Sequence, residues 1–494
     1  MKYLTSLLVF AAALWVGSSM AQSPLFSTRQ DVTGKGGSDY IAGISRTNQG
    51  EFLTFGVCDI VPTIVKGICV SRFSGEGEFL VSQTFTDGVS RMHLLRDGLS
   101  SWNDSLHVAA VDWNEHATLW CFDASGDTLW VRHPIAAIRN SQAGGTHFST
   151  TGEILFCGTT EADTLETSIF LARYSATGGS IWVQEYPLPL DWLDMMVHIG
   201  GLTELSDGGA VITGSRRDQF GDGAQQWMLG VNSTGELLYL NDIEGPGEGD
   251  TPHVTPTFNN TFTVAGMRRQ ENPNQPGDFC CPRPFFARFT NDGILLWNRL
   301  FQGTKREFTD FALRTLADGS VLSAGFTTHQ YGSNAYLFNV TASGDSSWHR
   351  EYSAPDTSCM NHAFMPHTIL IESPYRIVIG GVVGLCGNDH WLMRTDGSGM
   401  PPSSMGLITT LPETERIIPI LSAHPNPSNG ELHIHDTQAG YPIALRVHDA
   451  VGRLVMQLTV LSADDPLIIE GTGTYFLSMR NTMAVTAHQK LLVY

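Results

Sequence analysis

Five histidines stand at similar places in the repeats of this chain and could act together. They are His93, His147, His198, His253 and His362. An imidazole titrates near neutral pH and binds transition metals, so a ring of them could hold a metal or respond to pH. Each is predicted near the start of an innermost strand, which would place all five around the upper mouth of a central channel. Their offsets to the following turn vary, so ordinary polar lining of the channel is the alternative.

Arginine pairs and two tryptophans are the other candidates for ligand contact. The arginines follow predicted second strands, and they are Arg216, Arg217, Arg268 and Arg269. A guanidinium binds a carboxylate or sulfate through two parallel hydrogen bonds. Trp113 and Trp192 lie in or near long predicted loops, where an indole could stack on a sugar. Solvated loop charge is the alternative for the arginines, and packing is the alternative for the tryptophans.

The motifs of common enzymes are missing from the sequence. No G-x-S-x-G, H-E-x-x-H or P-loop occurs. The segment 218–223, DQFGDG, lacks the alternating acids and closing Glu of an EF-hand loop and is interpreted as a turn. No cysteine pair has C-x-x-C spacing, so we predict neither a metal nor a cofactor. Whether two carboxyl groups meet at glycosidic distance is a spatial question that one sequence does not answer.

The candidate residues belong to a two-part repeat with a period of about 50–58 residues, as in radial or stacked repeats. The first part is a turn and a short apolar run. These runs begin at Gly50, Asn103, Gly152, Gly208, Asn260, Gly319 and Tyr375. The second part is a strand, a tight Gly turn and often a Trp, and these are Trp130, Trp182, Trp297 and Trp348. Their recurrence predicts packing between repeats.

One repeat, from His198 to Leu240, contains four short apolar runs separated by turn residues. Four antiparallel strands in about 50 residues are typical of one propeller blade. Seven copies therefore predict an all-β, seven-bladed β-propeller over residues 22–408. Residues 24–35 are expected to supply the missing strand of the last blade, which would remove two free sheet edges. A pair of β-sandwiches is the alternative, but it leaves the repeat unexplained.

The lengths of the predicted connections differ between the two ends of the blades. First-to-second and third-to-fourth turns are uniformly short, for example SDGG at 206–209 and STGE at 233–236. The second-to-third and blade-to-blade connections are long and irregular, and the stretch 267–284 is one example. Binding residues usually lie on long loops carried by a rigid scaffold. We therefore expect the ligand on the long-loop face.

Composition and the N-terminus indicate an exported protein. The net charge is −20 with only 29 Lys and Arg, which disfavours nucleic acid as a partner. Residues 1–21 resemble a secretory signal peptide, with Lys2, an apolar stretch and Ala21 at the cleavage site. No later apolar stretch reaches the ~18 residues of a membrane span. Export permits disulfides, and the candidate local pairs are Cys58 with Cys69 and Cys359 with Cys386.

A Pro-bearing linker at 409–417 leads to a different pattern in residues 418–494. Alternating strands with Pro, Asn and Gly turns predict a small Ig-like β-sandwich. The positions that identify a resemblance are Pro425, Asn426, Pro427, Gly430, Asp449, Gly452, Gly473 and Tyr475. In their order and spacing they resemble the type A C-terminal sorting domain of the type IX secretion system. That resemblance implies export across the outer membrane, the secretion machinery as a partner, and release or display at the cell surface. An ordinary binding module is the alternative.

The sequence thus favours a secreted or surface-displayed propeller that binds a glycan or protein without catalysis. A polysaccharide-active or sialidase-like enzyme and a structural surface protein are the alternatives.

Overall fold

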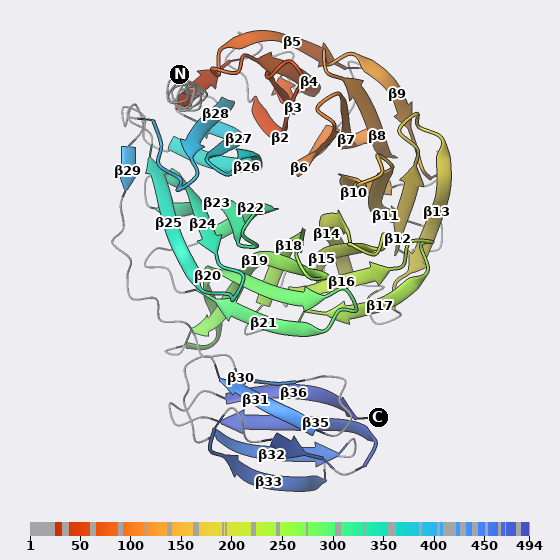
Figure 1. Ribbon diagram of the computed structural model, residues 1–494, viewed down its shortest axis with the longest axis vertical. Helices are drawn as coiled ribbons and strands as arrows, with labels where there is room; N and C mark the ends of the chain where they lie inside the picture. The colour runs from red at the N-terminus through yellow and green to blue at the C-terminus, as the bar shows by residue number, and fades with distance from the viewer. Residues whose placement is uncertain are drawn as a thin grey trace, which may run out of the picture.

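The computed structural model describes most of the chain as β-strands (Figure 1). The described ranges are 25–31, 39–59, 66–86, 92–113, 116–135, 141–161, 167–189, 192, 195–218, 224–243, 248–272, 275–301, 308–329, 332–353, 362–384, 388–402, 406–408, 421–424, 431–436, 443–449, 453–462, 466–469, 471–480 and 486–493. Among these residues there is no helix long and apolar enough to cross a membrane.

Five sheets contain four antiparallel strands each, in sequence order. The first is β2 (Tyr40–Arg46), β3 (Phe52–Asp59), β4 (Lys66–Phe73) and β5 (Phe79–Phe85). The second is β6 (Met92–Trp102), β7 (Leu106–Trp113), β8 (His116–Asp123) and β9 (Thr128–Arg132). The third is β10 (Ser141–Phe148), β11 (Ile154–Glu161), β12 (Thr167–Tyr174) and β13 (Ser180–Pro187). The fourth is β14 (Met195–Glu204), β15 (Ala210–Asp218), β16 (Gln225–Val231) and β17 (Leu237–Asp242). The fifth is β18 (Glu248–Thr257), β19 (Thr261–Asn272), β20 (Gln275–Thr290) and β21 (Leu295–Leu300).

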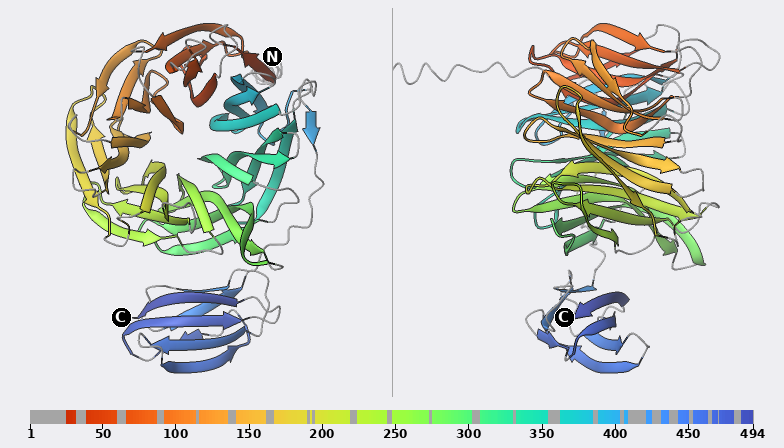
Figure 2. Two further views of the ribbon diagram at one scale, coloured as in Figure 1. Left: turned by 180° about the vertical axis from the view of Figure 1, so that it is seen from behind. Right: turned by 90° about the vertical axis from the view of Figure 1, so that its right-hand side faces the viewer.

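A nine-stranded sheet completes the ring. It contains β22 (Phe308–Thr315), β23 (Val321–His329), β24 (Gly332–Val340) and β25 (Ser346–Ser353), then β26 (His362–Ser373), β27 (Arg376–Gly384) and β28 (Asn388–Asp396). One short pairing connects its two parts: β24 is paired with β26 at Gly332 and Ser333. The short strand β29 (Gly406–Ile408) adds to the edge of β25. Together with the five preceding sheets, these strands surround a central opening, so the fold is a β-propeller (Figures 1 and 2).

The N-terminal strand β1 (Phe26–Gln30) is the outer strand of the last sheet. It pairs antiparallel with β28, from Phe26 opposite Arg394 to Gln30 opposite His390. The prediction that residues 24–35 supply the missing strand is therefore confirmed for the described part of that range. Strand pairing across the chain ends covers the outer edge of β28, which would otherwise be free to pair with another chain.

One turn type joins the strands at the short-turn end. In the turn from Asn232 to Glu236, the Asn232 N–H donates to the Glu236 carbonyl and Gly235 N–H donates to Asn232, both at 3.0 Å. Gly235 has φ +83°, a left-handed conformation that glycine adopts without a steric penalty. The Asn232 side-chain oxygen also accepts bonds from the backbone N–H groups of Thr234 and Glu236. Asn, Asp, Ser and Thr recur at this first position because their side chains can make these bonds.

Large aromatic side chains of the outer strands pack on the turn glycines of the next sheet. Trp130 of β9 lies over Gly178, where an added Cβ would be 2.8 Å from the indole, and its Nε1–H donates to the Ala176 carbonyl at 3.2 Å. The same pairing joins Trp182 to Gly235, Trp297 to Gly344, Trp348 to Gly399 and Tyr239 to Gly293. The predicted packing role of the repeated tryptophans is confirmed. Phe26 of β1 lies over Gly77 in the same way, so the ring closes with the contact used elsewhere.

Replacing Trp130 with Ala is expected to lower the free energy of unfolding by about 3 kcal/mol. The value is the low end of the range for Trp-to-Ala changes in cores, because Trp130 is only half-buried. Urea denaturation monitored by circular dichroism would measure it. Its neighbour Leu129, which is 50% exposed, provides the control, since Leu129→Ala is expected to change stability by less than about 0.5 kcal/mol. Equal losses in the two variants would contradict the packing role.

The innermost strands share a β-bulge at the point where they approach one another. The pairing register shifts once in each of β2, β10, β14 and β22, and also in β6, β18 and β26. Glycines at the bulges permit close contact between neighbouring sheets. A Cβ on Gly144 would lie 2.6 Å from Ile199, and one on Gly200 would lie 2.3 Å from the Pro252 carbonyl oxygen. The bulge therefore fixes how near the strands come to the axis.

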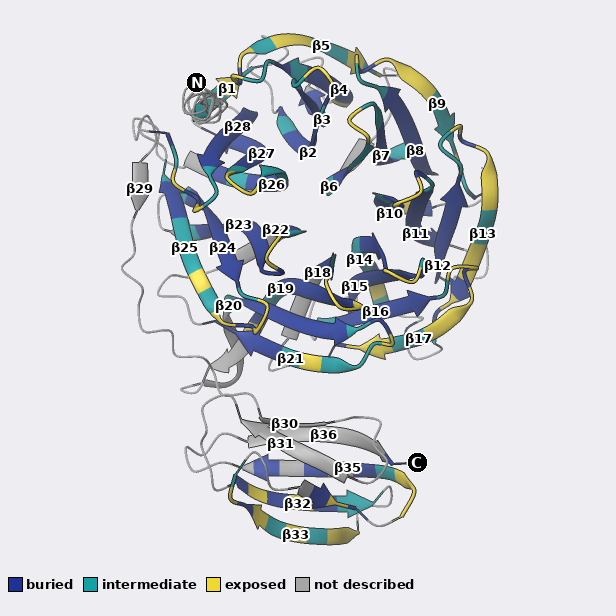
Figure 3. Ribbon diagram, viewed as in Figure 1, coloured by how far each residue is buried: buried dark blue, intermediate teal, exposed yellow. Residues whose placement is uncertain are grey.

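The middle strands of the sheets are more buried than the outer strands. The middle strands of the sheets are almost entirely buried, whereas β5, β9, β13 and β17 carry most of the exposed positions (Figure 3). Buried clusters lie between successive sheets, as between Leu155 of β11 and Trp227 of β16. Since each sheet can bury its faces only against its neighbours, the core is a series of interfaces around the ring.

Two further sheets lie after the propeller. One contains β30 (Leu421–His424), β31 (Glu431–Asp436) and β34 (Pro466–Ile468). The other contains β33 (Leu454–Val460), β32 (Ile443–Asp449), β35 (Gly473–Arg480) and β36 (Thr486–Val493), in that spatial order. Ile443, Leu445 and Val447 alternate along β32 and face a separate buried cluster with Leu477. This period of two is what a strand with one buried face requires.

Candidate functional site

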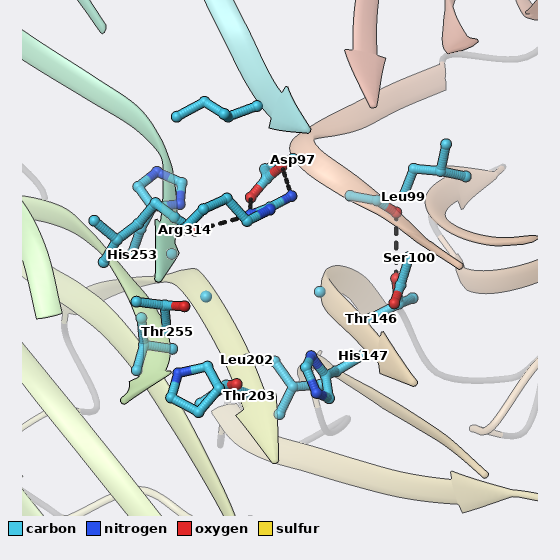
Figure 4. Close-up of a pocket in the computed structure, with 18 of the residues that line it drawn as sticks. Asp97, Leu99, Ser100, Thr146, His147, Leu202, Thr203, His253, Thr255 and Arg314 are labelled. Carbon is cyan, nitrogen blue, oxygen red and sulfur yellow. Dashed lines mark hydrogen bonds and ion pairs between the residues drawn. The ribbon is translucent and has the colours of Figure 1, made fainter. Parts of the chain in front are cut away.

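A cavity of about 220 Å³ lies where the innermost strands converge (Figure 4). The strands β2, β6, β10, β14, β18, β22 and β26 all contribute lining residues. In every strand these residues stand at the bulge or after it, for example Thr146 after Gly144 and Thr255 after His253. The cavity therefore occupies the half of the channel that leads to the short turns. The long-loop half, where we expected the ligand, consists largely of connections outside the described residues.

An ion pair crosses the channel at this cavity. Arg314 of β22 donates from Nη1 and Nη2 to the two carboxylate oxygens of Asp97 of β6, at 2.5 and 2.6 Å (Figure 4). Thr368 of β26 donates a third hydrogen bond to Asp97 at 2.9 Å. Burial raises the pKa of Asp97, while the Arg314 charge and these hydrogen bonds act against the rise. Three strands that are remote in sequence are thus tied together across the axis.

An unusually large bulge in β6 places Asp97 at this point. Leu94 and Leu99 pair with Val111 and Ala109, so four residues of β6 stand opposite one residue of β7. Asp97 itself has φ +58°, which non-glycine residues adopt rarely and Asp more readily than most. Our sequence analysis missed both Asp97 and Arg314. The Asp97–Gly98 dipeptide within an apolar run was the available signal, because such a pair predicts a bulge or turn.

Two of the five predicted histidines line the cavity. His147 and His253 follow the bulges of β10 and β18 (Figure 4). Burial lowers the pKa of His147 to about 4, and the nearby positive charge of Arg314 lowers it further. His147 is therefore a neutral imidazole at pH 7, able to donate from one ring nitrogen and accept at the other.

The other three histidines lie before the bulges. His93 is paired by strand register with Asp112, His198 lies with its Nε2 3.4 Å from Nη2 of Arg217, and His362 is the first residue of β26. The prediction that all five stand near a strand start is wrong for His147 and His253, because β10 and β18 begin at Ser141 and Glu248, well before these residues. Among the described residues, no three His, Cys, Asp or Glu side chains gather in a way that could hold a metal ion.

Asp112 of β7 is a second acid that the sequence analysis missed. Its carboxylate accepts a hydrogen bond from the backbone N–H of Ala143, in the next sheet. Burial raises its pKa to about 7, with the bond from Ala143 acting against the rise. An acid with this pKa can give up or take a proton at neutral pH, as a general acid does. A carboxyl group used only to join two sheets would show the same shift.

Arg216 and Trp192, both predicted to contact ligand, contact each other. The Arg216 guanidinium lies 4.0 Å from the centre of the Trp192 ring and makes two hydrogen bonds to Asp242, at 2.7 and 3.0 Å. Trp192 is 5% exposed and belongs to the core between two sheets. These contacts match the packing alternative for Trp192.

Arg268 and Arg269 stand on a hairpin instead of a loop. β19 and β20 continue through most of the stretch 267–284, which was predicted from the sequence to be a long loop. Prolines and polar residues suggested a loop, yet strand pairing persists, with Arg268 opposite Arg283. Arg268 is buried, lies 4.2 Å from the Phe285 ring and donates to the Ile243 carbonyl, whereas Arg269 is exposed.

Trp113 and the predicted disulfide between Cys58 and Cys69 occupy structural positions. Trp113 packs edge-on against Trp120 with ring centres 5.2 Å apart. Cys58 and Cys69 are bonded to each other across β3 and β4. Cys359 and Cys386 lie outside the described residues, as does most of the segment 218–223.

The C-terminal motif is described only in part. Asp449 ends β32 and accepts bonds from the Arg453 backbone N–H and side chain, both at 2.9 Å. Gly473 begins β35 with φ +147°, and Tyr475 is buried and donates to the Gly471 carbonyl at 3.3 Å. The remaining positions, Pro425, Asn426, Pro427, Gly430 and Gly452, lie outside the described residues.

Acidification from pH 7 to pH 4 is expected to destabilise the propeller. Burial lowers the pKa of His107 and His147 to about 4 and that of His390 to about 3. In the unfolded chain these groups bind a proton near pH 6.5, so below that pH the unfolded state holds more protons and folding becomes less favourable. Asp97 and Asp112 have raised pKa values, so their protonation favours the folded state as the pH falls. These two acids are outnumbered by the three histidines.

Scanning calorimetry at pH 7, 6, 5 and 4 would test this expectation. The melting temperature should fall at each step, and His390→Gln should reduce the slope. A melting temperature that stays level or rises on acidification would contradict it.

Comparison with known proteins does not assign this chain to a family. No family model matches the chain, and no curated protein matches it. Three solved structures illustrate the likeness that does occur. An α-L-arabinofuranosidase from Fusarium graminearum is 12% identical with a TM-score of 0.38, covering 75% of this chain and 94% of its own. The β-propeller domain of the Trilobed protease from Pyrococcus furiosus is 6% identical with a TM-score of 0.39, covering 73% and 97%. The polysaccharide lyase Uly1 is 7% identical with a TM-score of 0.43, covering 72% and 90%.

At TM-scores below 0.5 these likenesses carry no functional argument. The propeller rests on the strand pairing itself, and the function has to be argued from the site.

Proposed function

We propose that this chain is an exported β-propeller that binds a glycan or protein ligand at its central channel without catalysis. The observation that carries this proposal is the hydrogen bonding of Asp97, the acid that lines the channel. Both oxygens of Asp97 are engaged by Arg314 and one also by Thr368. Glycosidic hydrolysis uses two carboxyl groups, one of which must be free to attack or to activate water. A carboxylate held this firmly is suited to shaping a site.

An enzyme is the second candidate, and Asp112 favours it. Its pKa near 7 would let it act as a general acid at neutral pH. Polysaccharide-active chemistry would then use Asp112 as the proton donor.

One experiment separates the two candidates. The purified mature protein would be passed over immobilised polysaccharides and surface proteins, and every retained substrate would be assayed for released sugars. The binding proposal expects retention without product. Product formation that Asp112→Asn abolishes would replace the binding proposal with the enzyme. A structural surface protein would give neither retention nor product.

The number of blades and the form of the C-terminal domain are also part of this proposal. We infer seven blades, counting β22–β25 as the sixth and β26–β28 with β1 as the seventh. Support comes from the shared bulge and from the single short bridge between β24 and β26. We also infer that the two C-terminal sheets form one Ig-like sandwich. Limited proteolysis within 409–417 should release that sandwich intact while the propeller keeps its melting temperature.

Export is the remaining part of the proposal. Residues 1–21 would be removed as a signal peptide, and residues 418–494 would address the protein to type IX secretion and the cell surface. The supports are the N-terminal pattern and the spacing of the motif from Pro425 to Tyr475. Mass spectrometry of the exported protein should find Gln22 at the N-terminus and the C-terminal region removed. An intact N-terminus on protein retained inside the cell would reject it.

A further inference from the structure

We infer that the channel cavity binds one uncharged, hydroxyl-rich ring, such as a terminal neutral sugar residue of a glycan. This inference rests on the proposed function and specifies the site and the class of ligand. It places the ligand in the short-turn half of the channel, whereas the sequence favoured the long-loop face.

The charges of the cavity favour an uncharged ligand. Of the described residues that line it, only Asp97 and Arg314 carry a formal charge, and they neutralise each other in a bidentate pair. His147 beside them is neutral at pH 7. An anion would therefore meet no unpaired cation, and a cation would meet no unpaired acid. Burying either charge without a partner would be strongly unfavourable.

The hydrogen-bonding groups of the cavity match hydroxyls, which both donate and accept. The Ser100 hydroxyl accepts from the Phe148 N–H at 3.0 Å and keeps its own proton for a ligand oxygen. His147 faces the cavity and has no hydrogen-bond partner among the described residues (Figure 4). Leu202 and Leu370 also line the cavity and supply apolar surface for the C–H face of a ring.

The size of the cavity limits the ligand to a single small unit. A volume of about 220 Å³ falls below the ~300–1,000 Å³ of pockets that hold drug-sized molecules. The Asp97–Arg314 pair links β6 and β22 across the channel and forms part of the cavity wall. A glycan would accordingly insert only its end.

Ligand-detected NMR with the mature protein tests the inference. The probes would be methyl glycosides of neutral hexoses and pentoses, with glucuronate and galacturonate as the anionic arm. His147→Phe would replace the imidazole with an apolar ring that neither donates nor accepts a hydrogen bond, and Ser100→Ala would remove one hydroxyl. Lys66→Ala, an exposed position on β4, is the matched control. Melting temperatures would show which variants remain folded.

Saturable binding of at least one neutral glycoside is expected, unchanged in Lys66→Ala and weakened at least tenfold in His147→Phe. If His147→Phe fails to fold, Ser100→Ala should still weaken binding about threefold or more. Neutral binding that both variants leave intact would overturn the site, and binding of the uronates alone would overturn the ligand class. Polysaccharide retention without any monosaccharide binding would overturn this inference while the proposed function stands. Absence of both, together with no retention on immobilised surface proteins, would overturn the two together.

Discussion

Replacing Arg314 with Met should lower the free energy of unfolding by about 3 kcal/mol. The change leaves the Asp97 carboxylate buried in the channel without its cation, and breaking a buried ion pair from one side costs about 3–5 kcal/mol. We expect the lower end because the Arg314 side chain is 31% exposed and remains partly hydrated. Chemical denaturation with two independent probes would measure the loss.

Two variants make this result interpretable. Lys66→Met removes a cation from an exposed position and should change stability by less than about 0.5 kcal/mol. The double variant Asp97→Asn with Arg314→Met removes both charges, so it should recover part of the loss. A single-variant effect below about 1 kcal/mol would mean that water screens the pair, and the channel would then be more open than the structure indicates.

Deleting β1 should have the largest effect of any change in the propeller. The deletion uncovers the edge of β28, removes the ion pair between Arg29 and Asp389, and takes Phe26 away from Gly77. We expect a lower melting temperature and association of the protein, because an uncovered edge strand pairs with other chains. Size-exclusion chromatography and thermal unfolding of residues 32–408 would show both effects.

A point variant and a peptide give this prediction its controls. Phe26→Ala alone should cost about 2–3 kcal/mol, below a fully buried Phe because Phe26 is only half-buried. Tyr375→Ala, at a position 74% exposed, should have little effect. A synthetic peptide of residues 22–31 should restore the melting temperature of the deleted protein. Failure of the peptide, together with a deletion that stays monomeric and stable, would show that the ring does not depend on β1.

Local features could be predicted from the sequence because their causes are local. The turn from Asn232 to Glu236 needs a side-chain acceptor and a glycine three residues later, and both are visible in the chain. Trp130 was assigned to packing because an indole recurs at one position of the repeat. β1 was expected because the last repeat lacked a strand. In each case a short pattern is enough to determine the structure.

The site depended on contacts that no local pattern contains. Asp97 and Arg314 are 217 residues apart and meet only because a bulge in β6 turns a carboxylate toward the axis. Arg216 and Trp192 looked like ligand contacts because each stands near a predicted loop. They are instead partners of each other, which only the packing of Trp192 against β15 and β16 reveals. The hairpin of β19 and β20 was mistaken for a loop since its composition is rich in Pro and Asn.

The strand that closes the ring is also the first of the described strands. Arg29 must find Asp389, 360 residues later in the chain, before the last sheet is complete. Contacts of such sequence separation form slowly, because the intervening chain must be ordered first. The docking of β1 is therefore expected to be the final, rate-limiting step of folding. Until that step, the propeller is an open arc in which the edge of β28 is unpaired and can pair with another chain. The rate at which β1 docks is therefore as important to this protein as the stability of the closed ring.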